Sequence, residues 1–310
     1  MRVLFWGTPD FATPALRALL GEGFDVVAVV TQPDRAAGRS RSRLVAPAVK
    51  HIAIEESIPV LQPERPRGDD FLATARAFEP DVSLVVAYGH LLPAEAIDLA
   101  RLGTMNIHAS LLPALRGAAP IQAAILQGLD ETGVSIVRMV QRLDAGPVVL
   151  QQRTPILHDE TAGELTLRLS ELGALAAIEA LTLLDLGQST EREQDESLAT
   201  YAPKIDREMA RVSWSSGADE VARGVRAFDP RPGSFTRLDG RDVKLFGARA
   251  VRGIEGDAGR VLEIGEDGML VACGVDATRI AYVHPAGGRR LAALDWAQGR
   301  GVHAGDQFAS

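Results

Sequence analysis

The N-terminal part of the chain alternates between short apolar runs and longer segments in which apolar residues recur every three or four positions. Short runs are typical of buried strands, and the longer segments of helices that cover a sheet. The predicted strands are 3–6, 26–30, 60–61, 81–87 and 104–108. The predicted helices are 11–20, 45–56, 69–78, 93–99 and 118–127. Repeated strand–helix–strand units of this length predict an α/β domain with a Rossmann-like, mostly parallel sheet and helices on both faces.

After these units the pattern becomes richer in β-forming residues. Two stretches, 133–140 and 148–156, flank a turn at 144–147 and predict a hairpin at the edge of the sheet. The segment 162–186 then shows a long apolar face of helical period. We expect this helix to close a first domain that spans residues 1–187.

Residues 187–197 are polar and charged and have no hydrophobic period, so a linker is predicted over 188–205. A helix is predicted at 218–228. Short apolar stretches, several of them separated by Gly turns, follow at 234–238, 243–246, 259–264, 269–272 and 279–283. Short strands of this kind predict a small OB-like β-barrel as the C-terminal domain, residues 206–310.

The distribution of charge adds one feature. Residues 206–310 hold 15 basic and 15 acidic side chains, so the net charge of -8 lies entirely in residues 1–205. An acidic average argues against a general nucleic-acid binder. The segment 34–43 stands out against it, because it is basic and contains a glycine. It predicts a loop that contacts phosphates, with a merely solvated loop as the alternative.

Several classes of protein are excluded by what the sequence contains. Its single cysteine, Cys273, excludes an internal disulfide framework and a cysteine-based zinc site. The histidines have no partners at a recognisable ligand spacing, so no metal is expected. The longest apolar stretch, 172–187, contains Glu179 and Asp185 and is too short to span a membrane. With no apolar leader at the N-terminus, we expect a cytoplasmic protein.

Two polar residues in the predicted strand 104–108 are candidates for chemistry. Asn106 and His108 are two positions apart and therefore point to the same face of the strand. The strand ends there, at the carboxyl edge of the sheet, where open α/β folds bind ligands. An amide can donate to an oxyanion while an imidazole moves a proton. Hydrogen-bonded strand-end residues without a catalytic role are an equally good interpretation.

Asp144 is a third candidate, although Asp before Ala-Gly is a common turn residue. A carboxylate near His108 would stabilise the imidazolium and fix its tautomer. The sequence alone does not bring the two side chains together.

Six longer segments carry more specific patterns. They are Phe-Trp-Gly-Thr-Pro-Asp-Phe (5–11), Thr-Gln-Pro-Asp-Arg-Ala-Ala-Gly-Arg (31–39), Asn-Ile-His-Ala-Ser-Leu-Leu-Pro (106–113), Arg-Gly-Ala-Ala-Pro-Ile-Gln (116–122), Glu-Thr-Gly-Val-Ser-Ile (131–136) and Tyr-Ala-Pro-Lys-Ile (201–205). Together they resemble the methionyl-tRNA formyltransferase family from residue 5 to about residue 288. The third segment is shared by all folate-dependent formyltransferases. The second and fourth, with the trailing β domain, point to the tRNA-dependent branch.

The resemblance implies a transferase that moves the formyl group of 10-formyltetrahydrofolate to the amine of methionyl-initiator tRNA, for translation initiation. It implies a cytoplasmic enzyme that acts without a metal and, we expect, as a monomer. By the matching motifs, the resemblance implies that Asn106, His108 and Asp144 are catalytic. It implies that the folate is contacted by Ser110, Leu111, Leu112 and Pro113. It implies that the tRNA is contacted by Arg39, Arg41 and Arg43. Leu115 and Arg231 replace aromatic residues that are common in the family.

Other functions stay open at this point. A formyltransferase for an amino sugar nucleotide or a purine-precursor amine would keep 106–113 but would not explain the basic segment or the neutral β domain. A formyltetrahydrofolate hydrolase would use water as the acceptor. A nucleotide-dependent oxidoreductase needs a Gly-rich fingerprint that Pro9 disrupts. An RNA-binding module would leave Asn106, His108 and Asp144 unexplained.

Overall fold

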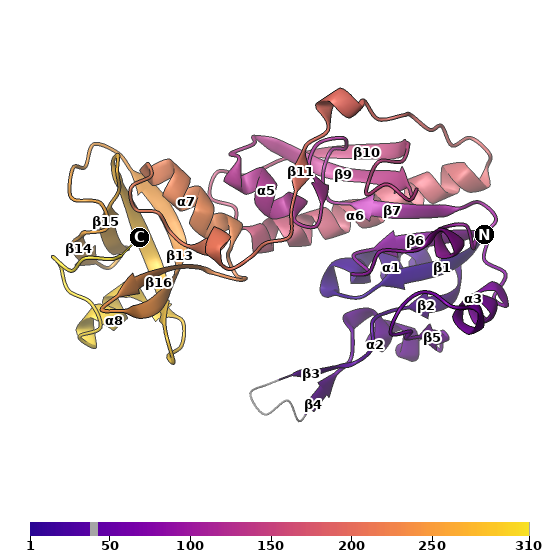
Figure 1. Ribbon diagram of the computed structural model, residues 1–310, viewed down its shortest axis with the longest axis horizontal. Helices are drawn as coiled ribbons and strands as arrows, with labels where there is room; N and C mark the ends of the chain where they lie inside the picture. The colour runs from indigo at the N-terminus through magenta and orange to yellow at the C-terminus, as the bar shows by residue number, and fades with distance from the viewer. Residues whose placement is uncertain (38–42, 310) are drawn as a thin grey trace. The chain divides into compact units, whose positions relative to one another are not determined.

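The computed structural model describes residues 1–37 and 43–309 (Figure 1). The chain forms two compact units. Unit 1 consists of Met1–Pro120, Thr132–Pro155 and Thr166–Ala202. Unit 2 consists of Ile121–Glu131, Ile156–Leu165 and Pro203–Ser310. Over the described residues, no helix is both long enough and apolar enough to cross a membrane.

The centre of unit 1 is a seven-stranded sheet with the order β10-β9-β7-β6-β1-β2-β5. Its strands are β1 (Arg2–Gly7), β2 (Asp25–Val30), β5 (Val60–Leu61), β6 (Val82–Val86), β7 (Thr104–His108), β9 (Glu131–Arg138) and β10 (Val148–Pro155). The pairs from β7 through β6, β1 and β2 to β5 are parallel, and β9 runs antiparallel to β7. The predicted mostly parallel α/β sheet is confirmed.

Helices lie on both faces of this sheet (Figure 1). They are α1 (Thr13–Gly21), α2 (Ala48–Glu55), α3 (Asp69–Arg76), α4 (Ala94–Ile97) and α6 (Ala162–Asp185). The helix α5 (Pro120–Leu126) belongs mostly to unit 2. Leu72 of α3 and Ile97 of α4 pack with Trp6 and Val85 on one face. On the opposite face Ile107 of β7 meets α6 so closely that a Cβ on Gly173 would lie 2.8 Å from it.

Two small sheets complete unit 1. The strands β3 (Arg35–Ala37) and β4 (Arg43–Val45) form an antiparallel pair. The strands β8 (Arg116–Gly117) and β11 (Tyr201–Ala202) form a parallel pair. The second pair shows that the polar segment 188–202, which we call the strap, lies on unit 1 within a few residues of the end of β7.

Unit 2 is built around a C-terminal antiparallel sheet of order β12-β13-β16-β15-β14, with β17 beside β16. Its strands are β12 (Ser234–Leu238), β13 (Arg241–Val251), β14 (Val261–Gly265), β15 (Gly268–Ala272), β16 (Ala277–Pro285) and β17 (Leu291–Ala292). Its further helices are α7 (Ala218–Ala227) and α8 (Ala293–Gln298). Trp214, Val225, Leu245, Ile280 and Phe308 belong to its core.

The sheet of unit 2 does not close on itself. Among the described residues, the edge strands β12 and β14 do not pair with each other, so the predicted OB-like barrel is not confirmed. Instead the tail 306–309 reaches both edges. The N–H of Ala309 donates to the carbonyl of Arg237 in β12, and the N–H of Phe308 donates to the carbonyl of Gly259 just before β14, each at 2.9 Å.

We predict that the tail stabilises unit 2 mainly through Phe308, which is 2% exposed and stacks on Trp214 at 5.8 Å between ring centroids. Phe308→Ala should lower the free energy of unfolding by about 3–5 kcal/mol, the usual cost of truncating a buried aromatic side chain. Urea denaturation followed by tryptophan fluorescence measures this. The control Val275→Ala, at a position 66% exposed, should change little, and equal effects of the two variants would contradict the prediction.

Candidate active site

Asn106 and His108 lie on the face of β7 that is turned away from α6. Side chains alternate along a strand, so the packing of Ile107 on α6 puts its two neighbours on the other face. Thr104 shares that face, and its hydroxyl donates to the carbonyl of Ile97 in α4 at 2.6 Å. Asn106 is half-buried and His108 is buried. The end of β7 therefore presents an amide and an imidazole side by side toward the α4 side of the sheet.

Both nitrogens of the His108 ring face an oxygen atom. Nε2 lies 3.0 Å from the carbonyl oxygen of Leu115, and Nδ1 lies 3.7 Å from Oδ2 of Asp144. A carbonyl oxygen can only accept a hydrogen bond, so Nε2 must carry a proton in this arrangement. The nitrogen that gains or loses a proton is then Nδ1, which faces the carboxylate.

Asp144 is fixed by the backbone of another segment. Its Oδ2 accepts a hydrogen bond from the N–H of Gly117 at 2.8 Å. The residue has a φ of 48°, in the left-handed region, and its side chain is 14% exposed. Two residues later, a Cβ at Gly146 would lie 1.9 Å from the carbonyl oxygen of Arg138, so only glycine fits there. The loop 142–146 is thus held in one tight conformation.

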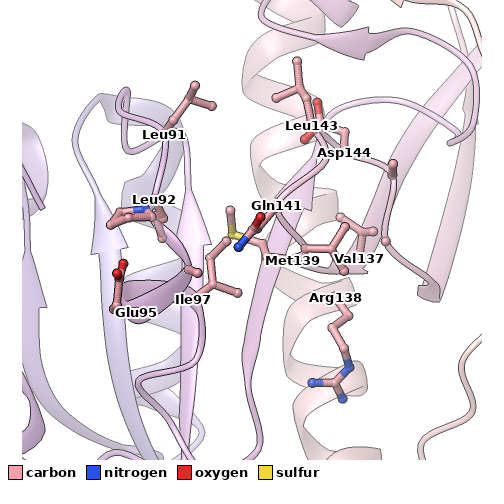
Figure 2. Close-up of a pocket in the computed structure, with 15 residues that line it drawn as sticks. Leu91, Leu92, Glu95, Ile97, Val137, Arg138, Met139, Gln141, Leu143 and Asp144 are labelled. Atoms are coloured by element: carbon pink, nitrogen blue, oxygen red, sulfur yellow. The ribbon is translucent and has the colours of Figure 1, made fainter. Parts of the chain in front are cut away.

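A cavity of about 450 Å³ lies beside this carboxylate. Figure 2 shows Leu91 and Leu92 on one side, Leu143 and Asp144 on the other, and Met139 and Gln141 between them. The full lining comprises residues 91–95, 97, 137–141 and 143–146. Apolar walls with a few polar groups suit a flat, heteroaromatic ligand. Asp144 lines the cavity and also faces His108, whereas Asn106 and His108 are not among the residues that line it.

The segment from Ser110 to Pro113 follows His108 directly and is anchored to β9 and β10. The hydroxyl of Ser135 donates to the carbonyl of Ser110 at 2.7 Å and accepts from the N–H of Leu112 at 3.0 Å. The amide of Gln151 donates to the carbonyl of Leu112 at 2.9 Å. Ser110, Leu111, Leu112 and Pro113 are not among the residues that line the cavity. Their contact with a folate stays a prediction.

Arg39 and Arg41 lie outside the described residues. Arg43 begins β4, and its side chain is likewise outside what the structure describes. Their contact with tRNA also stays a prediction.

Sequence reasoning missed the two segments that form the cavity walls. The signal was present in Leu91-Leu92-Pro93, an apolar segment shortly after β6, at the sheet edge where ligands bind. It also missed the role of Leu115, whose φ of 60° turns its carbonyl toward His108. In the part of the chain that the structure describes, no three His, Cys, Asp or Glu side chains are grouped so that they could hold a metal ion.

Comparisons with known proteins agree on one family. Residues 1–181 match the formyl transferase family and residues 204–301 match the formyl transferase C-terminal domain. A curated relative, the methionyl-tRNA formyltransferase of Nitrosomonas europaea, is 45% identical over 312 residues, which cover 99% of this chain and 96% of the relative. This identity extends through both units.

Solved structures share the fold at lower identity. HypX from Aquifex aeolicus in complex with tetrahydrofolic acid is 20% identical with a TM-score of 0.67; the match covers 95% of this chain but only 46% of HypX. Methionyl-tRNA formyltransferase from Clostridium thermocellum is 15% identical with a TM-score of 0.60, over 82% of this chain and 95% of that one. With the family matches to both of its halves and the 45% identity along nearly its whole length, the chain belongs to the formyl transferase family, in the group of the methionyl-tRNA formyltransferases.

Proposed function

We propose that the protein transfers the formyl group of 10-formyltetrahydrofolate to the amino group of methionyl-initiator tRNA. The observation that carries this proposal is the position of Asp144, which lines the cavity and faces His108 at 3.7 Å. Asp144 thus links the ligand cavity to His108, a group that can move a proton. The relative at 45% identity supports the choice of acceptor.

The chemistry follows from the groups at the end of β7. A free α-amine titrates near ~7.7–8.0, so about a tenth to a sixth of it is neutral and able to attack at pH 7. Attack on the formyl carbon forms a C–N bond and a tetrahedral oxyanion, to which the Asn106 amide donates. The His108 imidazole takes a proton from the incoming nitrogen at Nδ1. It returns the proton to the folate nitrogen as the oxyanion collapses to a carbonyl and the bond between that nitrogen and the formyl carbon breaks. Asp144 stabilises the imidazolium between these two transfers.

We propose that the cavity holds the pterin ring of the folate. Leu91, Leu92 and Ile97 offer an apolar wall for the ring, and Gln141 offers a polar group for its edge. Ser110, Leu111, Leu112 and Pro113 would contact the rest of the cofactor near His108. The solved HypX structure binds tetrahydrofolic acid, which supports a folate as the ligand class.

The tRNA would be bound by both parts of the chain. We propose residues 1–187 as the catalytic domain, 188–205 as the connection and 206–310 as a tRNA-binding domain, with Arg39, Arg41 and Arg43 contacting the acceptor end. The tail 306–309, which contacts both edge strands, supports a description of the C-terminal domain as an OB-like barrel closed through its tail. The proposed role in translation initiation places the enzyme in the cytoplasm, and we propose that it acts as a monomer.

The experiment that tests the function supplies purified protein with 10-formyltetrahydrofolate and with methionyl-initiator tRNA, an amino sugar nucleotide or no acceptor. Methionyl-initiator tRNA should be formylated at its amine. Formylation of an amino sugar nucleotide with no product on the tRNA would favour the alternative formyltransferase. Release of formate at the same rate without any acceptor would favour a hydrolase. Either of these results would overturn the proposal.

We predict that Asn106→Ala lowers kcat by about 10²–10³-fold with little change in either KM, because the amide would act on the oxyanion of the transition state. Asp144→Ala should also act on kcat rather than on KM. Steady-state kinetics on both substrates measure the split. The exposed Asp98→Ala serves as the matched control and should be as active as the wild type. Near-normal turnover in either variant would remove that residue from the catalytic group.

The cavity yields a second prediction. Leu143 is 51% exposed without a ligand and would be covered by a bound pterin. Burying that much leucine surface contributes about 1 kcal/mol to the free energy of folate binding. Leu143→Ala should therefore raise the KM for the folate about 5-fold and leave kcat and the KM for tRNA unchanged. Leu175→Ala on α6, at a position 65% exposed, is the control. An unchanged folate KM in Leu143→Ala would place the ligand elsewhere.

The basic segment yields a third prediction. Arg39→Leu should reduce kcat/KM for methionyl-tRNA and leave folate binding intact. Replacing Arg41 and Arg43 with Ala should lower the slope of log affinity against log salt by roughly one unit for each phosphate that the variant no longer binds. The control replaces the exposed Arg65 and Arg67, which makes the same change of charge on unit 1. If the control lowers the slope equally, the effect is one of net charge and the segment has no special role.

A further inference from the structure

Arg116 lies between Leu115 and Gly117, whose backbone groups contact His108 and Asp144, and its guanidinium is buried. Arg116 of β8 is 1% exposed, which makes it the largest buried charged side chain in the described part of the chain. A buried charge is tolerated only where it is paired and hydrogen-bonded. The hydrogen-bond partners of Arg116 therefore show which segments its buried charge fixes in place.

Two side chains of the strap supply these partners. Oε1 of Gln194 accepts hydrogen bonds from Nε and Nη2 of Arg116 at 3.1 and 2.7 Å. The carboxylate of Glu196 accepts from Nη1 and Nη2 at 3.1 and 2.9 Å. The hydrogen bonds from Arg116, and then those from Arg142, lower the pKa of Glu196 to about 2. The guanidinium fork thus fixes the strap in both position and orientation.

The strap in turn holds the loop that carries Asp144. The side-chain amide of Gln194 donates to the carbonyl of Asp144 at 2.8 Å and to the carbonyl of Gly146 at 2.7 Å. The two N–H groups of this amide therefore bind the backbone carbonyls of the residues before and after Ala145. Glu196 also pairs with Arg142, the first residue of the same loop. Arg116, Gln194 and Glu196 form one connected network that ends on the backbone of Asp144.

We propose that this network is a positioning device for catalysis, in which Arg116 and Glu196 hold Gln194 and Gln194 holds Asp144 opposite His108. The inference rests on the proposed function, since it assigns an effect on formyl transfer. The three residues act through Asp144 and are positioning residues. The strap, whose sequence is typical of a linker, then forms part of the catalytic unit.

The reason for such a device lies in the loop itself. A non-glycine residue with a φ of 48° is in a sparsely populated conformation and holds it only where its surroundings enforce it. The bond from Gly117 fixes one carboxylate oxygen of Asp144, and the two bonds from Gln194 fix the backbone that carries it. A shift of about 1 Å at a catalytic group can cost about 10²-fold in rate.

Gln194→Glu is the sharpest test. It keeps the size of the side chain and the oxygen that accepts from Arg116, but it removes both donors to the loop and puts an oxygen against two carbonyls. The expected result is a fall in kcat of about 10- to 100-fold with both KM values within about 2-fold of the wild type. Asp195→Asn is the matched control: Asp195 is the next residue of the strap, and its side chain accepts from Ser197 instead of contacting the loop.

The same change in an Asp144→Ala background separates positioning from general damage. If Gln194 acts through Asp144, Gln194→Glu should cost nothing further there. If Gln194 has a merely structural role, the falls in kcat of the two single variants should multiply in the double variant, and this result would overturn the inference. Wild-type kcat in Gln194→Glu would overturn it as well. Thermal unfolding checks that each variant folds. If Gln194→Glu does not fold, Glu196→Gln is tested instead; it keeps one acceptor oxygen for Arg116 and replaces the other with an N–H donor. It must show the same kcat-only loss, and wild-type kcat would overturn the inference.

The activity of the wild-type enzyme in the same assay distinguishes a failure of the proposed function from a failure of the positioning role. An inactive wild type would contradict the proposed function. An active wild type with equally active strap variants would contradict only the positioning role.

Discussion

The His108 imidazole is held between two oxygens that accept hydrogen bonds, the carbonyl of Leu115 at 3.0 Å and the carboxylate of Asp144 at 3.7 Å. The first contact keeps a proton on Nε2, because a carbonyl cannot donate one. All exchange of protons is thereby assigned to Nδ1, on the side of the carboxylate. The 3.7 Å distance is too long for a direct hydrogen bond, so Asp144 acts on the ring mainly through its charge.

Both oxygens depend on the strap. The N–H of Leu115 donates to the hydroxyl of Thr200 at 2.9 Å, and Gln194 holds the backbone of Asp144. The strap lies some eighty residues after β7 in the sequence and returns through the parallel pair β8–β11. A mostly polar chain segment thus determines the geometry on both sides of the imidazole. The parallel sheet contributes the fixed end of β7 from which Asn106 and His108 project.

The elements that sequence predicted well are those governed by local periodicity. The strand 104–108 appears with the predicted bounds, and the face shared by Asn106 and His108 follows from simple alternation. What sequence did not predict depends on partners far along the chain. Asp144 has the sequence of an ordinary turn, and Gln194 has that of a linker, because polar side chains that pair at long range leave no periodic signal. The tail around Phe308 was missed for the same reason, as single bridges rather than a strand connect it to the sheet.

The most direct test of this account is the protonation state of the His108 ring, measured by ¹⁵N NMR on protein labelled with ¹⁵N-histidine. A His108→Gln variant assigns the signals. At a pH where the ring is neutral, the account predicts that Nε2 carries the proton and that Nδ1 has the shift of an unprotonated nitrogen. A neutral ring protonated at Nδ1, with a bare Nε2, would contradict it, because the Leu115 carbonyl would then have no donor and Asp144 would not face the titrating nitrogen.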